Sequence, residues 1–288
     1  MRASSTSRSP SRRRRRARRR SGTGWLLALA LMALAGGAGT LAFGVPQIRA
    51  ADTSGPTATV APTGSAPASP TGSPAVSPSP SPKAPPVYRL PGNPPERGEN
   101  SFTIGTTRGA VAGRSGTLRT YRIAVEVGSK EDVEEFGAFV DRTLSDPRSW
   151  TAGGQVRLQR VARGEDYDFT VYLATRYTAH EMCARGGTNN NINGVSYTSC
   201  RAVGQVIVNL DRWRLSVDHF VEAKIPLSLY REYVVNHETG HELGRSHERC
   251  PGDGKTAPVM MQQTLFLDGC TANAWPYVKG RLYRGPLL

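Results

Sequence analysis

The stretch HETGHELGRSH, at residues 237–247, is the most informative part of this 288-residue chain. Three of the five histidines of the chain fall inside it, with the spacing H-E-x-x-H-x-x-G-x-x-H. Residues four apart on a helix lie one turn above each other, so His237 and His241 share a face. Gly244 is the helix-ending glycine, because it can adopt the left-handed conformation that turns the chain back. The turn then delivers His247 to the same place from another direction.

Histidine and glutamate in this pattern are typical of a catalytic metal site. Imidazole nitrogens bind zinc at about 2.0–2.1 Å, and three of them leave one tetrahedral position open, which is typical of catalytic zinc. Glu238 is rotated by about 100° from His237 on the helix and can reach a water in that position. We therefore expect one catalytic Zn²⁺ with His237, His241 and His247 as metal ligands and Glu238 as the catalytic base.

The hydrophobic pattern around the motif predicts an α+β domain. The helix that carries the motif opens at Pro226 and runs to about Gly244. Other elements are a helix at 130–144, strands at 120–127, 155–161 and 167–174, and a hairpin of 195–202 with 205–210 around Gly204. Residues 186–194 (GGTNNNING) predict a loop. A second His-Glu pair, His180-Glu181 at the start of HEMCA, lacks the second histidine of an H-E-x-x-H motif, and we expect it at the surface or in a loop.

The motif resembles that of the metzincin clan of zinc endopeptidases, which implies a twisted mixed sheet and an active-site helix. In that clan a methionine in a tight turn, the Met-turn, lies beneath the metal ligands. Met260, within APVMMQQ at 257–263, is our choice for it, and Met261 is the alternative. Some metzincins have a zinc-binding Tyr two residues later, where this chain has Gln262. The stretch 230–264 also resembles a family of uncharacterised exported actinobacterial proteins.

The resemblance implies an extracytoplasmic zinc-dependent endopeptidase, a hydrolase that cleaves peptide bonds with a zinc-bound water activated by Glu238. A peptide or protein substrate would add as a strand to an exposed sheet edge, for which 203–210 is the candidate. Gln262 or Gln263 would help to stabilise the oxyanion. Two alternatives remain open, a non-catalytic zinc-containing cell-envelope binding protein and an amide hydrolase acting on a wall polymer.

The cysteines predict disulfide bonds rather than a second metal site. The chain has four, with no C-x-x-C pair among them. In an exported protein such cysteines form disulfides. Of the three possible connectivities we favour Cys183–Cys200 with Cys250–Cys270, because both bonds close local loops. The second bond would brace the segment that leads from His247 to the methionine turn.

The first 97 residues indicate export and anchoring rather than part of the domain. Residues 1–24 hold ten Arg and no acid, and 25–45 hold no charge over a length that spans a bilayer as one helix. We expect a cytoplasmic tail and a transmembrane anchor, with a cleaved signal segment and a secreted protein as the alternative. Residues 46–97 are rich in Pro, Ser and Thr and predict a disordered linker. The domain would then occupy 98–288.

The net charge of +14 belongs mostly to the N-terminal tail. Eleven of the 37 basic residues precede residue 51, which leaves 26 basic against 23 acidic residues beyond it. The domain is therefore nearly neutral, and we expect no nucleic-acid partner. The expected localisation is the cell membrane, crossed once by the N-terminal helix with the C-terminal domain outside the cytoplasm.

Overall fold

The computed structural model describes residues 85–288 of the chain. The predicted cytoplasmic tail at 1–24, the transmembrane anchor or signal segment at 25–45 and the linker up to residue 84 lie outside the described residues. Within 85–288 no helix has the length and apolar character needed to cross a bilayer.

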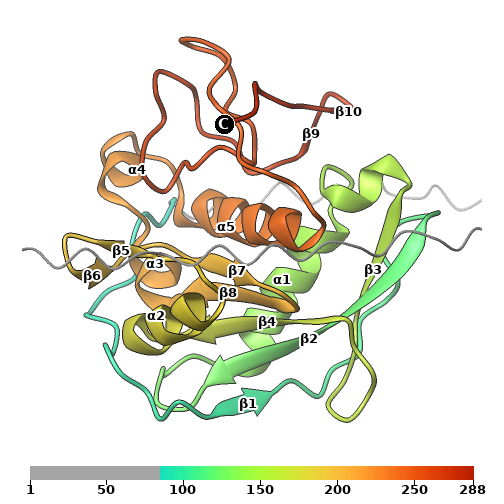
Figure 1. The fold of residues 1–288 in the computed structure, drawn as a ribbon, viewed down its shortest axis with the longest axis vertical. Helices are drawn as coiled ribbons and strands as arrows, with labels where there is room; N and C mark the ends of the chain where they lie inside the picture. Colours follow the sequence, from blue (N-terminus) through green and yellow to red (C-terminus); the bar gives the residue numbers. More distant parts are fainter. Residues whose placement is uncertain (1–84) are drawn as a thin grey trace, which may run out of the picture. The chain divides into compact units, whose positions relative to one another are not determined.

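A mixed six-stranded sheet forms the centre of the domain (Figure 1). Strands β2, β3, β4 and β8 run parallel in their pairings β2–β3, β2–β4 and β4–β8, whereas β1 and β7 pair antiparallel with β2 and β8. The strands are β1 (Phe102–Ile104), β2 (Thr117–Glu126), β3 (Val156–Arg160), β4 (Phe169–Ala174), β7 (Cys200–Ala202) and β8 (Gln205–Asn209).

Helices cover both faces of this sheet and make it a mixed α+β domain. The larger hydrophobic cluster joins one sheet face to α1, α3, α4 and α5, and a smaller one joins the other face to α2. In β2 the alternate residues Tyr121, Ile123 and Val125 point into the larger cluster, as the period of a half-buried strand requires. The helices are α1 (Val133–Ser145), α2 (Arg176–Arg185), α3 (Leu210–Leu215), α4 (Asp218–Glu222) and α5 (Leu227–Glu242), with a 3-10 turn η1 (Trp150–Gly153).

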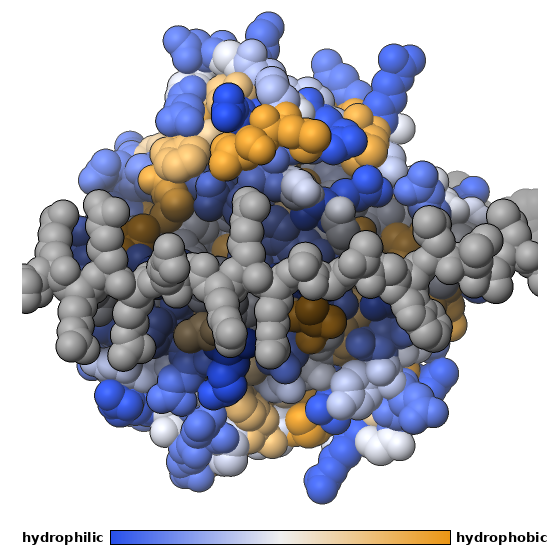
Figure 2. Space-filling view, in the orientation of Figure 1, coloured by the Kyte–Doolittle hydropathy of each residue, from blue (hydrophilic) through white to orange (hydrophobic). Residues whose placement is uncertain are grey.

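The C-terminal segment lies over α5 on the side away from the sheet (Figure 1). It contains the short pair β9 (Tyr277–Val278) and β10 (Arg281–Leu282), and its buried Val259, Met260 and Trp275 join the larger cluster. Helix α5 is therefore enclosed between the sheet and this segment. Figure 2 shows hydrophobic side chains gathered across the surface of the upper part of the domain, where Figure 1 places the segment.

The strands and helices predicted from periodicity are confirmed within three residues at each end by α1, α5, β2, β3, β4 and β8. The hairpin around Gly204 is also confirmed, although β7 begins at Cys200, five residues after the predicted start. Helix α2 was not predicted. It contains His180-Glu181, for which the expected surface position is confirmed because Glu181 is exposed and His180 is half-buried. The helix buries Ala179, Met182 and Cys183 against the sheet. Its buried side is made largely of small residues, which leave a weak amphipathic signal. The predicted loop at 186–194 also contains β5 (Asn191–Ile192), which pairs with β6 (Val195–Ser196).

The free edge of the sheet beside α5 is β7. Strand β8 lies between β4 and β7, so the prediction that 203–210 forms the edge is wrong. The reason is the direction of the hairpin. The chain forms β7 first and then turns inward at Gly204, where φ is 72°, to place β8 next to β4.

The ordered domain begins before the predicted boundary at residue 98. The carbonyl of Val87 accepts a hydrogen bond from the backbone N–H of Leu227 at 2.8 Å. The N–H of Leu90 donates to the carbonyl of Arg214, also at 2.8 Å. The first contact satisfies one of the backbone N–H groups that the start of α5 leaves without a helical partner. The part of the predicted linker from residue 87 onward therefore belongs to the domain.

Both disulfides predicted from loop closure are confirmed, and the described residues contain no free cysteine. Cys183–Cys200 joins α2 to β7. Cys250–Cys270 closes the loop that contains the methionine turn. Disulfides persist in oxidising compartments, so this pair suggests a location outside the cytoplasm.

One buried carboxylate joins three segments at the end of β2. Glu126 is 1% exposed and accepts hydrogen bonds from the backbone N–H of Asn100 at 3.0 Å, the N–H of Thr175 at 2.7 Å and the hydroxyl of Thr178 at 2.6 Å. It thereby ties the N-terminal segment and the start of α2 to the sheet.

We expect Glu126→Ala to lower the free energy of unfolding by about 2–4 kcal/mol, because three donors, two of them buried, lose their acceptor. Urea denaturation followed by circular dichroism measures the change. The control is the exposed Glu99→Ala, for which we expect a change below about 0.5 kcal/mol. Equal stability of the two variants would contradict the role given to Glu126.

Candidate metal centre

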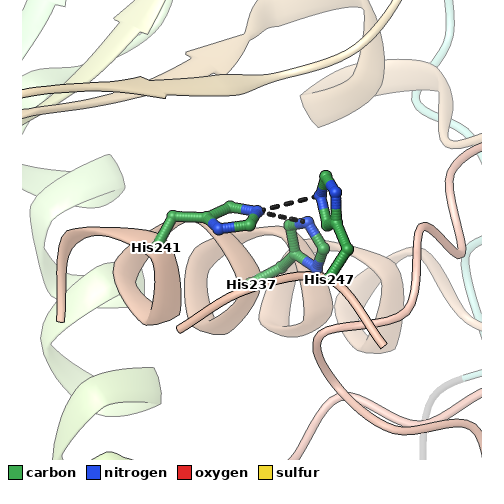
Figure 3. A group of neighbouring side chains, drawn as sticks. All are labelled: His237, His241 and His247. Carbon is green, nitrogen blue, oxygen red and sulfur yellow. Dashed lines mark hydrogen bonds between the residues drawn. The ribbon is translucent and has the colours of Figure 1, made fainter. Parts of the chain in front are cut away.

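Three histidine side chains converge in the way the sequence motif predicts (Figure 3). His237 and His241 project from α5, and His247 comes from the segment after the helix. The Nε2 atom of His241 lies 3.2 Å from Nε2 of His237 and 3.0 Å from Nε2 of His247. One ligand atom of each residue lies within 4.8 Å of the others, so the cluster could hold a metal ion.

The outward-facing ring nitrogens fix the tautomers of two of these histidines. Nδ1 of His237 lies 2.8 Å from the carbonyl oxygen of Val259, and Nδ1 of His241 lies 2.8 Å from that of Arg245. A carbonyl oxygen can only accept a hydrogen bond, so both Nδ1 atoms carry the proton. The Nε2 atoms of His237 and His241 then have free lone pairs that face each other.

The surroundings keep these imidazoles neutral. Burial and the neighbouring His241 hold the pKa of His237 well below its usual value. Burial also lowers the pKa of His241, and the nearby charge of Arg201 adds to that effect. For His247, burial and His241 lower the pKa to about 4. Neutral imidazole is the form that binds a metal.

The geometry of the cluster fits a divalent cation. Two neutral acceptor nitrogens 3.2 Å apart repel each other unless a positive charge lies between them. Tetrahedral bonds of about 2.05 Å would place ligand nitrogens about 3.3 Å apart, which is close to the spacing of these atoms. Three imidazole donors suit zinc and several other transition metals.

Glu238 follows the first histidine on α5 and lines the same cleft. Its side chain is buried, and this burial raises the pKa of its carboxyl group to about 8. A carboxylate with a raised pKa, next to a candidate metal position, is a stronger base than an exposed glutamate. The arrangement therefore provides three metal donors and one proton acceptor.

A cleft of about 500 Å³ opens over these residues. The metal-binding face of α5 forms one wall, and residues 198–201, which lead into and include most of β7, form another. The rest of the lining comes from residues 188–192, 244–247, 262, 264 and 265, with Tyr233 of α5. The candidate metal centre is thus open to a ligand that enters beside the sheet edge.

The chain turns back after α5 at the glycine of the motif. Helix α5 ends at Glu242, and Gly244 has a φ of 81°, in the left-handed region. The N–H of Arg245 donates to the carbonyl of Gly240 at 2.9 Å, which closes the helix end. This reversal brings His247 to the helix face, as the sequence predicts.

Met260 lies beneath α5, and its alternative Met261 does not. A Cβ on Gly240 would lie 2.5 Å from Sδ of Met260 and 2.6 Å from Cζ2 of Trp150. Met261 is instead buried in a separate cluster with Cys270. The backbone next to Met260 also contacts the site, through the carbonyl of Val259. The glycine inside α5 therefore makes room for the methionine turn.

The side chain of Gln263 does not line the cleft, so the prediction that it stabilises the oxyanion is wrong. Its side chain is fully buried. Its amide donates to the carbonyls of Pro258 and Asn273 and accepts from the N–H of Asn273. Gln262 does line the cleft and is the remaining candidate.

Sequence reasoning missed several polar residues of the cleft, among them Tyr233, Arg201 and Arg245. Tyr233 lies one turn before His237 on α5, and its hydroxyl donates to the carbonyl of Met261 at 3.0 Å. The position of Tyr233, four residues before a ligand, was a usable signal. Arg201 comes from another element, so nothing near it in the sequence indicates the site.

The fold and this cluster define an α+β domain with a candidate three-histidine metal centre. The chain belongs to the family described as Protein of unknown function (DUF3152), whose model matches residues 90–278. Comparison with curated proteins and with solved structures found no match.

We expect the full chain to bind one divalent metal ion through the three histidines. His247→Ala should weaken zinc binding by more than about 100-fold, because even losing a hydrogen-bond partner of a ligand costs about 10–100-fold. Inductively coupled plasma mass spectrometry of the dialysed protein measures the bound metal, and isothermal titration calorimetry measures the zinc affinity. His180→Ala is the control, since His180 is outside the cluster. Unchanged affinity in His247→Ala would refute the assignment.

We also expect Gly240→Ala to destabilise the protein by about 1–3 kcal/mol, because its Cβ has no room beside Met260 and Trp150. The same change in an exposed helix would stabilise it by about 1 kcal/mol. Urea denaturation of Gly240→Ala, of Met260→Ala and of the double variant measures the coupling between the two positions. We expect a coupling term that partly offsets the two single losses. A stabilised Gly240→Ala protein would contradict the packing of Met260 beneath α5.

Proposed function

We propose that this protein is an extracytoplasmic zinc-dependent endopeptidase with a metzincin-like domain. The observation that carries the proposal is the convergence of three neutral imidazoles beside one buried glutamate at the floor of an open cleft. The position of Met260 beneath the helix supports the likeness to the metzincin clan.

His237, His241 and His247 would hold the ion, through Nε2 in the first two. A bound Zn²⁺ would supply Lewis-acid chemistry, polarising a scissile carbonyl and acidifying water. The backbone carbonyls of Val259 and Arg245 hold the first two imidazole rings in orientation. This orientation keeps the Nε2 atoms of His237 and His241 directed at one point.

Glu238 would act as the general base. Its carboxylate takes a proton from the attacking water and gives it to the leaving nitrogen of the peptide bond. The carboxyl group can hold the proton between the two steps, and the burial that raises its pKa makes the carboxylate a stronger base. Burial keeps this carboxylate out of bulk solvent, where it would be a weaker base.

Strand β7 would hold the substrate in an extended conformation. It has a partner strand, β8, on one side only, and residues 198–201 line the cleft. An extended peptide can add to the free side by main-chain hydrogen bonds. The side-chain amide of Asn190 donates to the carbonyl of Thr198 at 3.0 Å, so pairing would begin after that residue.

The proposed location is outside the cytoplasm, anchored by one N-terminal helix or released after its cleavage. The two disulfides support it, since such bonds are rare in reducing compartments. The Arg-rich stretch before the apolar run favours the orientation with the domain exported.

We expect Glu238→Gln to lower cleavage of a proteome-derived peptide library by about 10²–10⁴-fold while one zinc ion stays bound, because only the base is lost. Mass spectrometry of the products and metal analysis of the same sample measure the two effects. The matched control is Glu222→Gln, an exposed residue of α4.

Two results would overturn the proposal. The first is a wild-type protein that holds zinc and cleaves no peptide, which would favour a binding role in the cell envelope. The second is hydrolysis of amide bonds in a wall polymer without peptide cleavage, which would favour the amide hydrolase.

A further inference from the structure

The charges in the cleft are unevenly distributed. Among the described residues that line it, Glu238 is the only carboxylate, whereas Arg201 and Arg245 bring two permanent positive charges. Most of the other polar lining consists of amides and hydroxyls, which carry no charge. The cleft therefore has no acidic wall to receive a basic substrate.

Arg201 lies on β7 and is held in place by a buried carboxylate. Its Nε donates to Oε2 of Glu242 at 2.7 Å, and the N–H of Gly204 donates to the same oxygen at 3.2 Å. The side chain of Arg201 keeps 30% of its exposure and lines the cleft. Within residues 85–288 its terminal nitrogens make no hydrogen bond, so they remain available to a ligand. Glu242 thus fixes the guanidinium without using its outer edge.

Arg245 follows Gly244 at the same end of α5. It lines the cleft, and its carbonyl oxygen receives the Nδ1 proton of His241. Its guanidinium lies 3.4 Å from Oε1 of Gln155 and 5.6 Å from the Trp150 ring. In the described part of the chain no carboxylate forms an ion pair with it. Its charge is therefore not balanced locally.

The local charge remains positive when the neighbouring groups are counted. Arg119 approaches Glu242 at 3.6 Å and Asp168 at 3.5 Å. Three arginines thus stand against two carboxylates at this end of α5. At the other end, where β5 and β6 lie (Figure 1), the cleft is lined by neutral residues such as Asn190 and Ile192.

We infer that the cleft selects peptides with a carboxylate side chain, which binds to the terminal nitrogens of Arg201 at the C-terminal end of α5, with Arg245 adding positive charge nearby. The inference rests on the proposed endopeptidase function and adds a substrate class to it. Guanidinium groups bind carboxylates with two parallel hydrogen bonds, and such pairs are stronger and more directional than neutral ones. A partly desolvated position beside the edge strand would increase this discrimination.

The test uses peptide pairs that differ only by Glu against Gln at one position, scanned along the sequence. For the full wild-type chain we expect kcat/KM to be about tenfold higher for the Glu peptide at one position. Arg201→Gln should bring that ratio close to one, whereas Arg245→Gln should lower it only in part because the guanidinium of Arg245 contacts Gln155. Arg201→Lys should keep part of the preference, because the charge remains. Arg163→Gln removes an exposed arginine outside the cleft lining and should change nothing.

Binding of the same peptides to the Glu238→Gln protein separates this inference from the proposed function. Cleavage of both members of every pair at equal rates would refute the inference and leave the peptidase intact. Tighter binding of Glu peptides that are never cleaved would refute the peptidase function and support the carboxylate-binding subsite. Absence of both preference and cleavage would overturn both. A preference that survives unchanged in Arg201→Gln would refute the subsite.

Discussion

The histidine cluster depends on one constraint, the repulsion between the unprotonated Nε2 atoms of His237 and His241. Nε2 atoms of His237 and His241 lie 3.2 Å apart with their protons committed to backbone carbonyls on the far side of each ring. A cation at the centre would make that arrangement favourable. The enclosure of α5 between the sheet and the C-terminal segment keeps the rings from moving apart.

The third ligand needs the most support because it does not lie on α5. The N–H of Glu248 donates to the carbonyl of Met260 at 3.1 Å, and the N–H of Leu288 donates to the carbonyl of His247 at 3.0 Å. The buried Glu248 carboxylate also accepts from the Arg284 side chain at 2.8 Å. These contacts tie the ligand both to the methionine turn and to the last residues of the chain. The Cys250–Cys270 bond closes the same loop.

The parts of this protein that were predictable from sequence are those encoded by local spacing. The positions of His237, His241 and Gly244 follow from helical geometry, and the main strands follow from alternation. The free edge of the sheet was not predictable, because hairpin direction depends on which neighbour β8 pairs with. The same holds for Gln263 and Arg201. The Gln263 amide is buried by hydrogen bonds within an irregular loop, and Arg201 is held at the cleft by Glu242, which lies 41 residues later.

The hydrogen bond from Leu227 to Val87 sets a limit on how short a folded version of this domain can be. A fragment that starts at residue 98 would leave an unsatisfied amide in the first turn of α5, the helix that carries His237 and His241, whereas a fragment that starts at residue 85 keeps the hydrogen bond. The family match begins at residue 90, three positions too late to include this contact. Domain boundaries for recombinant work should therefore be taken from the backbone of α5 and not from the similarity alone.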